Sequence, residues 1–329
     1  MSFEVAIIGI ETVHGQEILS KLNDREFPIS KIHVACEDKN LIKTISFGDK
    51  TLKMVHVDQL SLDSMDVIFL TGTKPIAAKI IAKGANATII DLTESDGKLM
   101  SIPDLGYFPP KGAKIIASPS SSTIQLCGSI LPIEKLGKIE SITLSTYHSV
   151  SEIGRPAMDE LFNQVRTIYM NHEPKMQNFP KQIAFNVIPQ VSAFEDDHGT
   201  TEEQHIITES TSLLDSAPQI AATCVFVPTF VGHAQSVTVQ FKDDFAIKDI
   251  KTAWRDNDNI QIIDLESEME YVTPCEIHGE QQVFLSRIRK NTHLENSLSF
   301  WSVMDNLQNG CAYNAVRIAE HILDVETPA

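Results

Sequence analysis

Short apolar runs that alternate with helical patterns restrict the fold of this chain more than any other feature. Residues 5–8 are all apolar, and runs rich in apolar residues follow at 31–35, 66–70, 87–91 and 113–117. Such runs are typical of strands buried on both faces. Residues 15–22 and 75–82 between them have helical apolar spacing, and residues 53–57 alternate like an edge strand. Strands that alternate with helices predict an α/β fold with a doubly wound parallel sheet of the Rossmann type.

The pattern changes near residue 130. Segments 140–147, 220–227 and 234–241 indicate longer strands in which Ser and Thr alternate with apolar residues, whereas 154–170 and 200–214 indicate helices. Residues 307–323 have the pattern of an amphipathic helix. A length of 329 residues suits two domains, and the second is predicted to be of the α+β type.

Charge and cysteine usage limit the partners and the compartment. The chain has 27 basic and 44 acidic residues, a net charge of −17, which predicts that it binds neither nucleic acid nor an anionic membrane surface. No apolar run is long enough to span a bilayer. The five cysteines form no CxxC pair, and we expect free thiols in a reducing cytoplasm.

The turn after the first predicted strand is the first candidate site. Gly9 and Gly15 bracket it, Thr12 stands at the middle glycine position of a dinucleotide-binding turn, and Glu11 adds a negative charge. The turn therefore predicts either a pyrophosphate site or a tight strand-to-helix turn without a ligand. Asp38, after the second strand, is either an acid for the ribose hydroxyls of NAD or part of a solvated loop.

Two further segments carry chemistry-bearing side chains. Residues 117–125 are rich in Ser and Thr and lie between a predicted strand and helix, so their hydroxyls either cap the helix or supply a nucleophile at its N-terminus. His233 follows an apolar strand, and a single histidine in such a place is more often structural than catalytic.

Motifs spread along the chain resemble those of one enzyme family. They are Tyr147 with residues 149–151, then 157–161, 185–190 (Phe-Asn-Val-Ile-Pro-Gln), 223–225, 230–233 (Phe-Val-Gly-His), 287–289, 305–307, 314–316 and 318–320. With these motifs the chain resembles the aspartate-semialdehyde dehydrogenases nearly from end to end. The resemblance implies a cytoplasmic homodimer with a dinucleotide-binding domain at 1–130, completed by a C-terminal helix in 305–329. Residues 131–304 would form a catalytic and dimerisation domain.

The resemblance also implies roles for single residues. Ser121, in the segment Ser118-Pro119-Ser120-Ser121-Ser122-Thr123, takes the position of the family's nucleophilic cysteine, and His233 takes that of the general base. The dinucleotide would lie against a set of residues from both ends of the chain: Gly9, Thr12, Val13, His14, Asp38 and Asn306. The substrate pocket would contain His148, Glu202, His205 and Phe226.

Several of these positions depart from the family. Phe226 replaces the arginine that clamps the substrate carboxylate, His205 replaces a lysine and His148 a glutamine. The family's Gly-Ala-Gly turn is Glu152-Ile153-Gly154 here. The arginine that binds phosphate falls near Gly97, and the arginine that meets the NADP 2′-phosphate falls on Asp38. Each departure removes a charge-assisted contact worth roughly 1.5–3 kcal/mol.

We therefore expect a homologue without phosphorylating dehydrogenase activity, dimeric and either non-catalytic or repurposed. NAD is favoured over NADP, or neither binds, and a small-molecule ligand or a paralogous enzyme is an alternative partner. The second hypothesis is an NAD(P)-dependent oxidoreductase acting on an aldehyde or other small carbonyl substrate, with Asn306 near the nicotinamide. The third, a serine hydrolase using Ser121 and His233, has no evident third residue to orient the histidine.

The pocket histidines raise the question of a metal. By analogy with the family, His148, His205 and His233 should converge with Glu202 nearby, and such a set would suit zinc. The spacing contains no HxxxH or HxH motif. From the sequence, no metal ligands are predicted.

Overall fold

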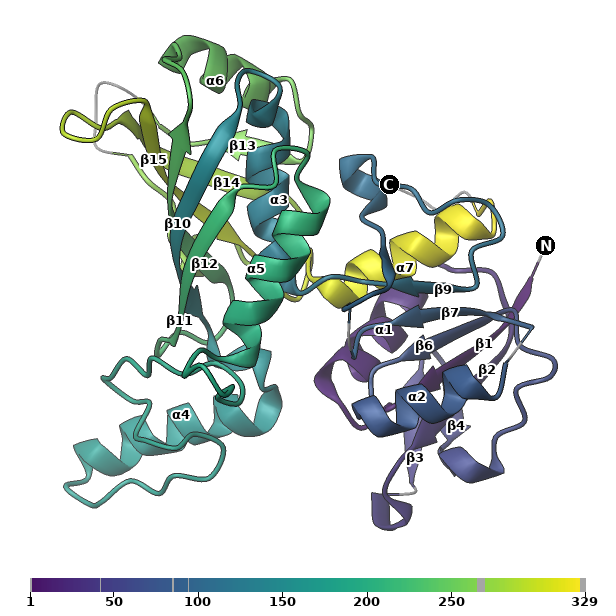
Figure 1. Cartoon of the computed structure of the whole chain (residues 1–329). Helices are drawn as coiled ribbons and strands as arrows, with labels where there is room; N and C mark the ends of the chain where they lie inside the picture. The colour runs from purple at the N-terminus through teal and green to yellow at the C-terminus, as the bar shows by residue number, and fades with distance from the viewer. Residues whose placement is uncertain (1, 42, 85, 94, 265–269, 326–329) are drawn as a thin grey trace. The chain divides into compact units, whose positions relative to one another are not determined.

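The computed structural model (Figure 1) describes residues 2–41, 43–84, 86–93, 95–264 and 270–325. Contacts between residues divide the chain into two compact units, Met1–Pro119 with Cys311–Ala329 and Ser120–Gly310. We refer to them as unit 1 and unit 2. The sequence had placed the boundaries at 130/131 and 304/305, several residues from those of the structure.

Unit 1 is built around a seven-stranded sheet in which every strand pair is parallel. In spatial order the strands are β5 (Val55–His56), β2 (Ile29–Cys36), β1 (Phe3–Ile8), β6 (Val67–Leu70), β7 (Thr88–Asp91), β9 (Ile115–Ala117) and β8 (Leu99–Met100). A separate hairpin of β3 (Thr44–Phe47) and β4 (Lys50–Lys53) precedes β5. The predicted doubly wound parallel sheet is confirmed.

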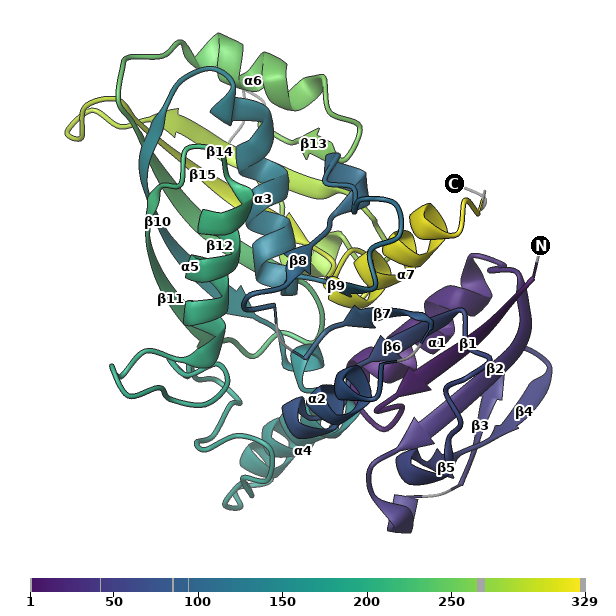
Figure 2. The same ribbon diagram turned by 45° about the vertical axis from the view of Figure 1, so that its right-hand side comes forward.

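Helices cover both faces of this sheet (Figure 2). Apolar side chains of α1 (Val13–Asp24) and α7 (Cys311–Ile322) pack with Val5 and Ile7 of β1, whereas those of α2 (Lys74–Ala82) pack with Ala6 and Ile8 on the other face. The alternation along β1 thus separates two cores. The final helix begins at Cys311 rather than at 307, because Asp305 Oδ1 accepts from the backbone N–H of Leu307 and forms a tight turn first.

Unit 2 contains a mixed six-stranded sheet. Its spatial order is β11 (Gln219–Phe226), β10 (Ile139–His148), β12 (His233–Phe241), β15 (Ser297–Met304), β14 (Val283–Lys290) and β13 (Ile260–Ile262). The helices of the unit are α3 (Ser121–Glu134), α4 (Arg155–Tyr169), α5 (Thr201–Leu213) and α6 (Ile247–Arg255). Figure 1 shows α3 and α5 side by side over one face of the sheet. The predicted α+β composition of this part is confirmed.

Buried hydrogen bonds explain why α3 belongs to unit 2. Gln125 Nε2 donates to Ser302 Oγ of β15 over 3.0 Å, and Trp254 Nε1 of α6 donates to the Ser129 carbonyl over 2.7 Å. The residues of these bonds are all buried, so separating α3 from the sheet would leave polar groups without partners. None of the helices in the described residues is both long and apolar enough to cross a membrane.

Candidate functional site

Two buried histidines lie next to each other at the ends of neighbouring strands. His148 is the last residue of β10 and His233 is the first of β12. These strands are antiparallel, and the pairing of Tyr147 with Ala234 puts the two histidines at adjacent positions. Their ring centroids are 4.5 Å apart. The sequence resemblance implied that both belong to one pocket, and in the structure they meet.

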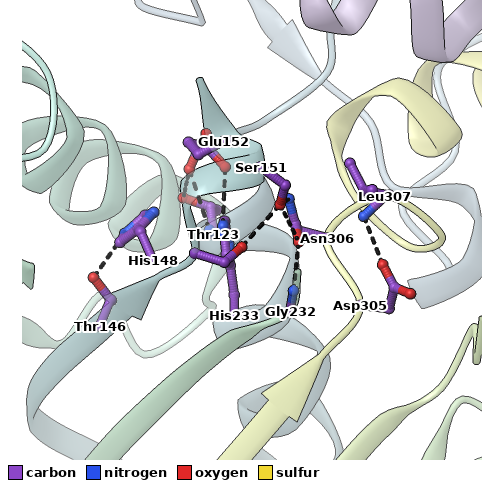
Figure 3. Close-up of polar contacts among 12 residues, drawn as sticks. Thr123, Thr146, His148, Ser151, Glu152, Gly232, His233, Asp305, Asn306 and Leu307 are labelled. Atoms are coloured by element: carbon purple, nitrogen blue, oxygen red, sulfur yellow. Dashed lines mark hydrogen bonds and ion pairs between the residues drawn. The ribbon is translucent and has the colours of Figure 1, made fainter. Parts of the chain in front are cut away.

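Glu152 joins this pair from the short 3-10 helix η4 (Val150–Glu152) that follows β10. Backbone N–H groups of Val150 and Ser151 donate to the carbonyls of Thr229 and Phe230, which fixes η4 against the loop before His233. Glu152 Oε2 lies 2.9 Å from His233 Nε2, an ion-pair distance (Figure 3). One ligand atom from each of Glu152, His148 and His233 lies within 4.8 Å of the others.

The environment of His148 determines its charge and orients its ring. Burial, together with the neighbouring His233, lowers the pKa of His148 to about 3, so the ring is neutral near pH 7. His148 Nε2 lies 2.8 Å from Thr146 Oγ1. The other nitrogen, Nδ1, is buried without a hydrogen-bond partner in the described residues. In the tautomer in which Nε2 donates to Thr146, Nδ1 carries a lone pair.

The turn that carries His233 is held by an amide side chain. Asn306 Oδ1 accepts from the Gly232 N–H over 3.0 Å, and Asn306 Nδ2 donates to Ser151 Oγ over 3.0 Å (Figure 3). Gly232 has φ +92°, a left-handed conformation that favours glycine. Asn306, expected from the family resemblance beside a nicotinamide, therefore joins the segments that carry Glu152 and His233.

Ser121 occupies the first turn of α3, and its side chain is buried. The N-cap is Ser120, whose Oγ accepts from the Thr123 N–H over 3.2 Å. Ser120 also donates its own N–H to Glu209 Oε2 over 2.9 Å. A carboxylate thus lies at the helix terminus that would otherwise stabilise a nucleophilic anion. Gln235 Nε2, two residues beyond His233, donates to the Ser122 carbonyl over 2.9 Å and ties this terminus to β12.

Neither of the two cysteines of unit 2 that lie in its core supplies a reactive thiolate. Burial raises the pKa of Cys127, in the middle of α3, to about 12. Cys224 pairs with Thr146 in the β10–β11 register, and burial together with the charge of Glu202 raises the pKa of its thiol. Both side chains are thiols near neutral pH and therefore poor nucleophiles.

The remaining predicted pocket residues separate into two groups. Phe226 is buried and packs edge-on against Phe179 and against the His148 ring, with centroids 5.3 Å and 6.0 Å apart. It forms an apolar wall where the resemblance implied an arginine in other family members. Glu202 and His205 lie on α5, and neither belongs to the His148–Glu152–His233 group. Among the described residues the candidate metal-ligand group differs from the one that the resemblance suggested, because Glu152 joins His148 and His233 and the half-buried His205 is not part of the group.

The predicted dinucleotide turn lies in unit 1. Gly9 has φ +93°, and a Cβ there would lie 2.4 Å from the backbone nitrogen of Gly72, so only glycine fits. Thr12 is the N-cap of α1, where its Oγ1 accepts from the Gly15 N–H, and half-buried Val13 and His14 begin the helix. The strand-to-helix geometry of a phosphate-binding turn is therefore present.

Acidic side chains lie near this turn, and their negative charge would repel an anionic ligand. Glu11 Oε1 accepts from the Glu37 N–H over 2.7 Å, and its Oε2 is buried without a hydrogen-bond partner in the described residues. The Glu37 carboxylate accepts from the backbone N–H and the Oγ1 of Thr73, at the N-terminus of α2. Exposed Asp38 accepts from Asn40. Glu37 and Asp38 thus place negative charge directly after β2.

Comparisons with known proteins agree on one family. The family model "semialdehyde dehydrogenase, dimerisation domain" matches residues 130–309. An aspartate-semialdehyde dehydrogenase of Rickettsia conorii is 33% identical over 331 residues, covering 98% of both chains. That of Bacillus subtilis is 30% identical over 336 residues, covering 97% of this chain and 96% of its own.

Solved structures give the same result for the fold. The crystal structure of aspartate-semialdehyde dehydrogenase II from Vibrio cholerae, complexed with ASA, superposes with a TM-score of 0.88 at 29% identity, over 98% of this chain and 99% of the other. The enzyme from Candida albicans, solved with NADP, has a TM-score of 0.72 at 17% identity, and 99% of each chain is covered.

Proposed function

Because the chain belongs to the aspartate-semialdehyde dehydrogenase family, we propose that it keeps the fold of that family without catalysing the phosphorylating oxidation of aspartate semialdehyde. The observation that carries this proposal is Ser121 at the N-terminus of α3, with the carboxylate of Glu209 at the same terminus. A serine hydroxyl is almost never ionised near neutral pH, whereas a cysteine with a pKa near ~8.5 needs little help to form a thiolate.

The surroundings of Ser121 support the same conclusion. His233 Nε2 lies 2.9 Å from Glu152 Oε2, so the histidine at the family's general-base position faces a carboxylate here. The pKa values of Cys127 and Cys224 are raised, so neither thiol replaces the missing nucleophile. Phe226 offers a substrate carboxylate an apolar ring in place of a cation. Losing such a charge-assisted contact costs about 1.5–3 kcal/mol.

A steady-state assay tests the proposal. Purified protein is supplied with aspartate semialdehyde, phosphate and either NADP or NAD, and reduced nucleotide is followed. We expect turnover far below ~1 s⁻¹, the lower end of ordinary enzymatic rates. Cys127→Ala is the matched control, because removing a buried, protonated thiol should leave any residual rate unchanged. Turnover of ~1 s⁻¹ or more would overturn the proposal.

The nucleotide preference follows from the acidic turn of unit 1. We propose that any dinucleotide bound there is NAD in preference to NADP, because Glu37 and Asp38 follow β2, where a 2′-phosphate would meet their negative charge. Isothermal titration with NAD and with NADP tests this preference. Tighter binding of NADP would contradict it, and Asp38→Arg should shift the preference toward NADP.

An oxidoreductase acting on an uncharged carbonyl is the second candidate function, and the apolar wall at Phe226 favours it.

We also propose that the protein is a homodimer formed through unit 2. The matched family model describes a dimerisation domain over most of this unit. In the middle of β10 and β12, one face is buried while paired side chains on the other, such as Thr143 and Thr238, are exposed or half-buried. A sheet with one uncovered face can pack against a second copy of itself.

A further inference from the structure

We propose that His148, Glu152 and His233 bind one zinc ion. This inference rests on the proposed function, because a histidine that coordinates zinc is not free to act as a general base. Two of the three residues are departures from the family pattern, His148 for glutamine and Glu152 for glycine. Both departures introduce a metal-ligating side chain, and both lie beside the retained His233.

The candidate ligand atoms of this group lie close together. His148 turns Nε2 toward Thr146, which leaves the buried Nδ1 on the side of His233 and Glu152 (Figure 3). His233 Nδ1 is buried without a hydrogen-bond partner in the described part of the chain, and its Nε2 lies 2.9 Å from Glu152 Oε2. A buried polar atom without a partner costs free energy, and coordination of a cation would remove that cost.

The spacing is close to what zinc requires. Zn–N and Zn–O distances of about 2.0–2.2 Å in a tetrahedral site place neighbouring ligand atoms roughly 3.4 Å apart. Glu152 Oε2 and His233 Nε2 are already 2.9 Å apart, and no pair of ligand atoms exceeds 4.8 Å. Rotation of the side chains by small angles would therefore suffice. Thr146 Oγ1 lies 2.8 Å from the distal His148 nitrogen, where it would accept from that nitrogen and orient a zinc-bound ring.

The two ring nitrogens and the carboxylate oxygen favour zinc over magnesium and calcium. Two neutral imidazoles and one carboxylate suit zinc, whereas magnesium and calcium prefer sites made only of oxygen ligands. Three protein ligands leave a fourth position for water, as in catalytic zinc sites. The two rings are almost fully buried, and the Glu152 side chain is 21% exposed, so an ion would enter beside the carboxylate.

Equilibrium dialysis of the full chain against zinc, with metal content measured after removal of free ion, tests the inference. Three variants probe the site: His148→Gln and Glu152→Gln remove ligands without large changes in volume, and Thr146→Val removes only the orienting oxygen. His205→Gln is the matched control, because this histidine lies on α5 outside the group. Substitution with cobalt(II) adds a readout, since its visible absorption reports the coordination of the bound ion.

We expect one zinc per chain in the wild type and in His205→Gln. Affinity should fall about 10–100-fold in Thr146→Val, the loss typical of removing an orienting partner, and at least as much in the two ligand variants. Zinc should raise the melting temperature of the wild type but not of Glu152→Gln. Absence of stoichiometric binding, or equal affinity in wild type and Glu152→Gln, would overturn the inference. The dehydrogenase assay, run with and without zinc, tests the proposed function separately.

Discussion

At position 121 the difference between a hydroxyl and a thiol decides whether an acyl group can be captured, but restoring the thiol is not enough. We predict that Ser121→Cys leaves turnover with aspartate semialdehyde, phosphate and NADP far below ~1 s⁻¹. Glu209 still places negative charge at the N-terminus of α3, and Phe226 still offers no cation to the substrate. The same steady-state assay checks this. A Ser121→Cys variant with a rate of ~1 s⁻¹ or more would show that the other departures matter little.

The residues of the site differ in how far the sequence predicts them. His148 and His233 could be assigned to one pocket, because each lies within a motif of the family. The sequence identifies Glu152 only as a replacement of a family glycine and does not predict its contact with His233. That contact depends on backbone hydrogen bonds between η4 and a loop some 80 residues later. The sequence predicts Asp38 rather than Glu37 as the acid beside a ribose, because composition does not encode the directions in which adjacent loop side chains point.

Among the elements, α7 shows how the end of the chain completes unit 1. Arg25, which follows α1, forms an ion pair with Glu320 of α7 over 2.6 Å, and both side chains are buried. Removing one partner of a buried pair leaves an uncompensated charge and typically costs about 3–5 kcal/mol. We predict that Glu320→Ala destabilises unit 1 by about that amount, while Asp104→Ala, which breaks the more exposed pair with Arg317, costs less.

Spectroscopy can separate the two units in this experiment. Both tryptophans, Trp254 and Trp301, lie in unit 2, so their fluorescence follows that unit, whereas far-ultraviolet circular dichroism follows both. In urea, Glu320→Ala should lose part of its dichroism at a lower concentration than wild type, before the tryptophan signal changes. A variant whose two signals shift together, or not at all, would contradict the role given to α7.

A local irregularity explains why the sequence did not predict strand β14. Strand β14 has a register shift between Ser286 and Arg289, and Arg287 there has φ +54°. This irregularity breaks the alternation that reveals a strand. The buried strands β1, β2, β6, β7 and β9 of unit 1, in contrast, agree with the predicted runs, because a run buried on both faces is recognisable without alternation. The more exposed β3, β4 and β8 were not predicted.

For the whole molecule, the open face of the unit 2 sheet leads to a prediction about assembly. A charge placed at its centre would have to be buried in a dimer formed by this face. We therefore predict that Thr143→Arg converts the protein from dimer to monomer, with unchanged secondary structure, in light scattering at micromolar concentration. The exposed Lys74 of unit 1 offers the control Lys74→Arg, which should remain dimeric. A monomeric wild type, or a dimeric Thr143→Arg, would contradict the proposal.

The most direct test of the account is a rapid-mixing measurement of hydride transfer. Wild-type protein at high concentration is mixed with aspartate semialdehyde and NADP, with NAD in a parallel series, and absorbance of the reduced nucleotide is followed over the first turnover. The family resemblance implies that hydride transfer follows attack of the side chain at position 121 on the aldehyde, so we expect Ser121 to give no burst with either nucleotide. A burst of reduced nucleotide equal to the protein concentration would contradict the claim that this chain has lost the reaction of its family.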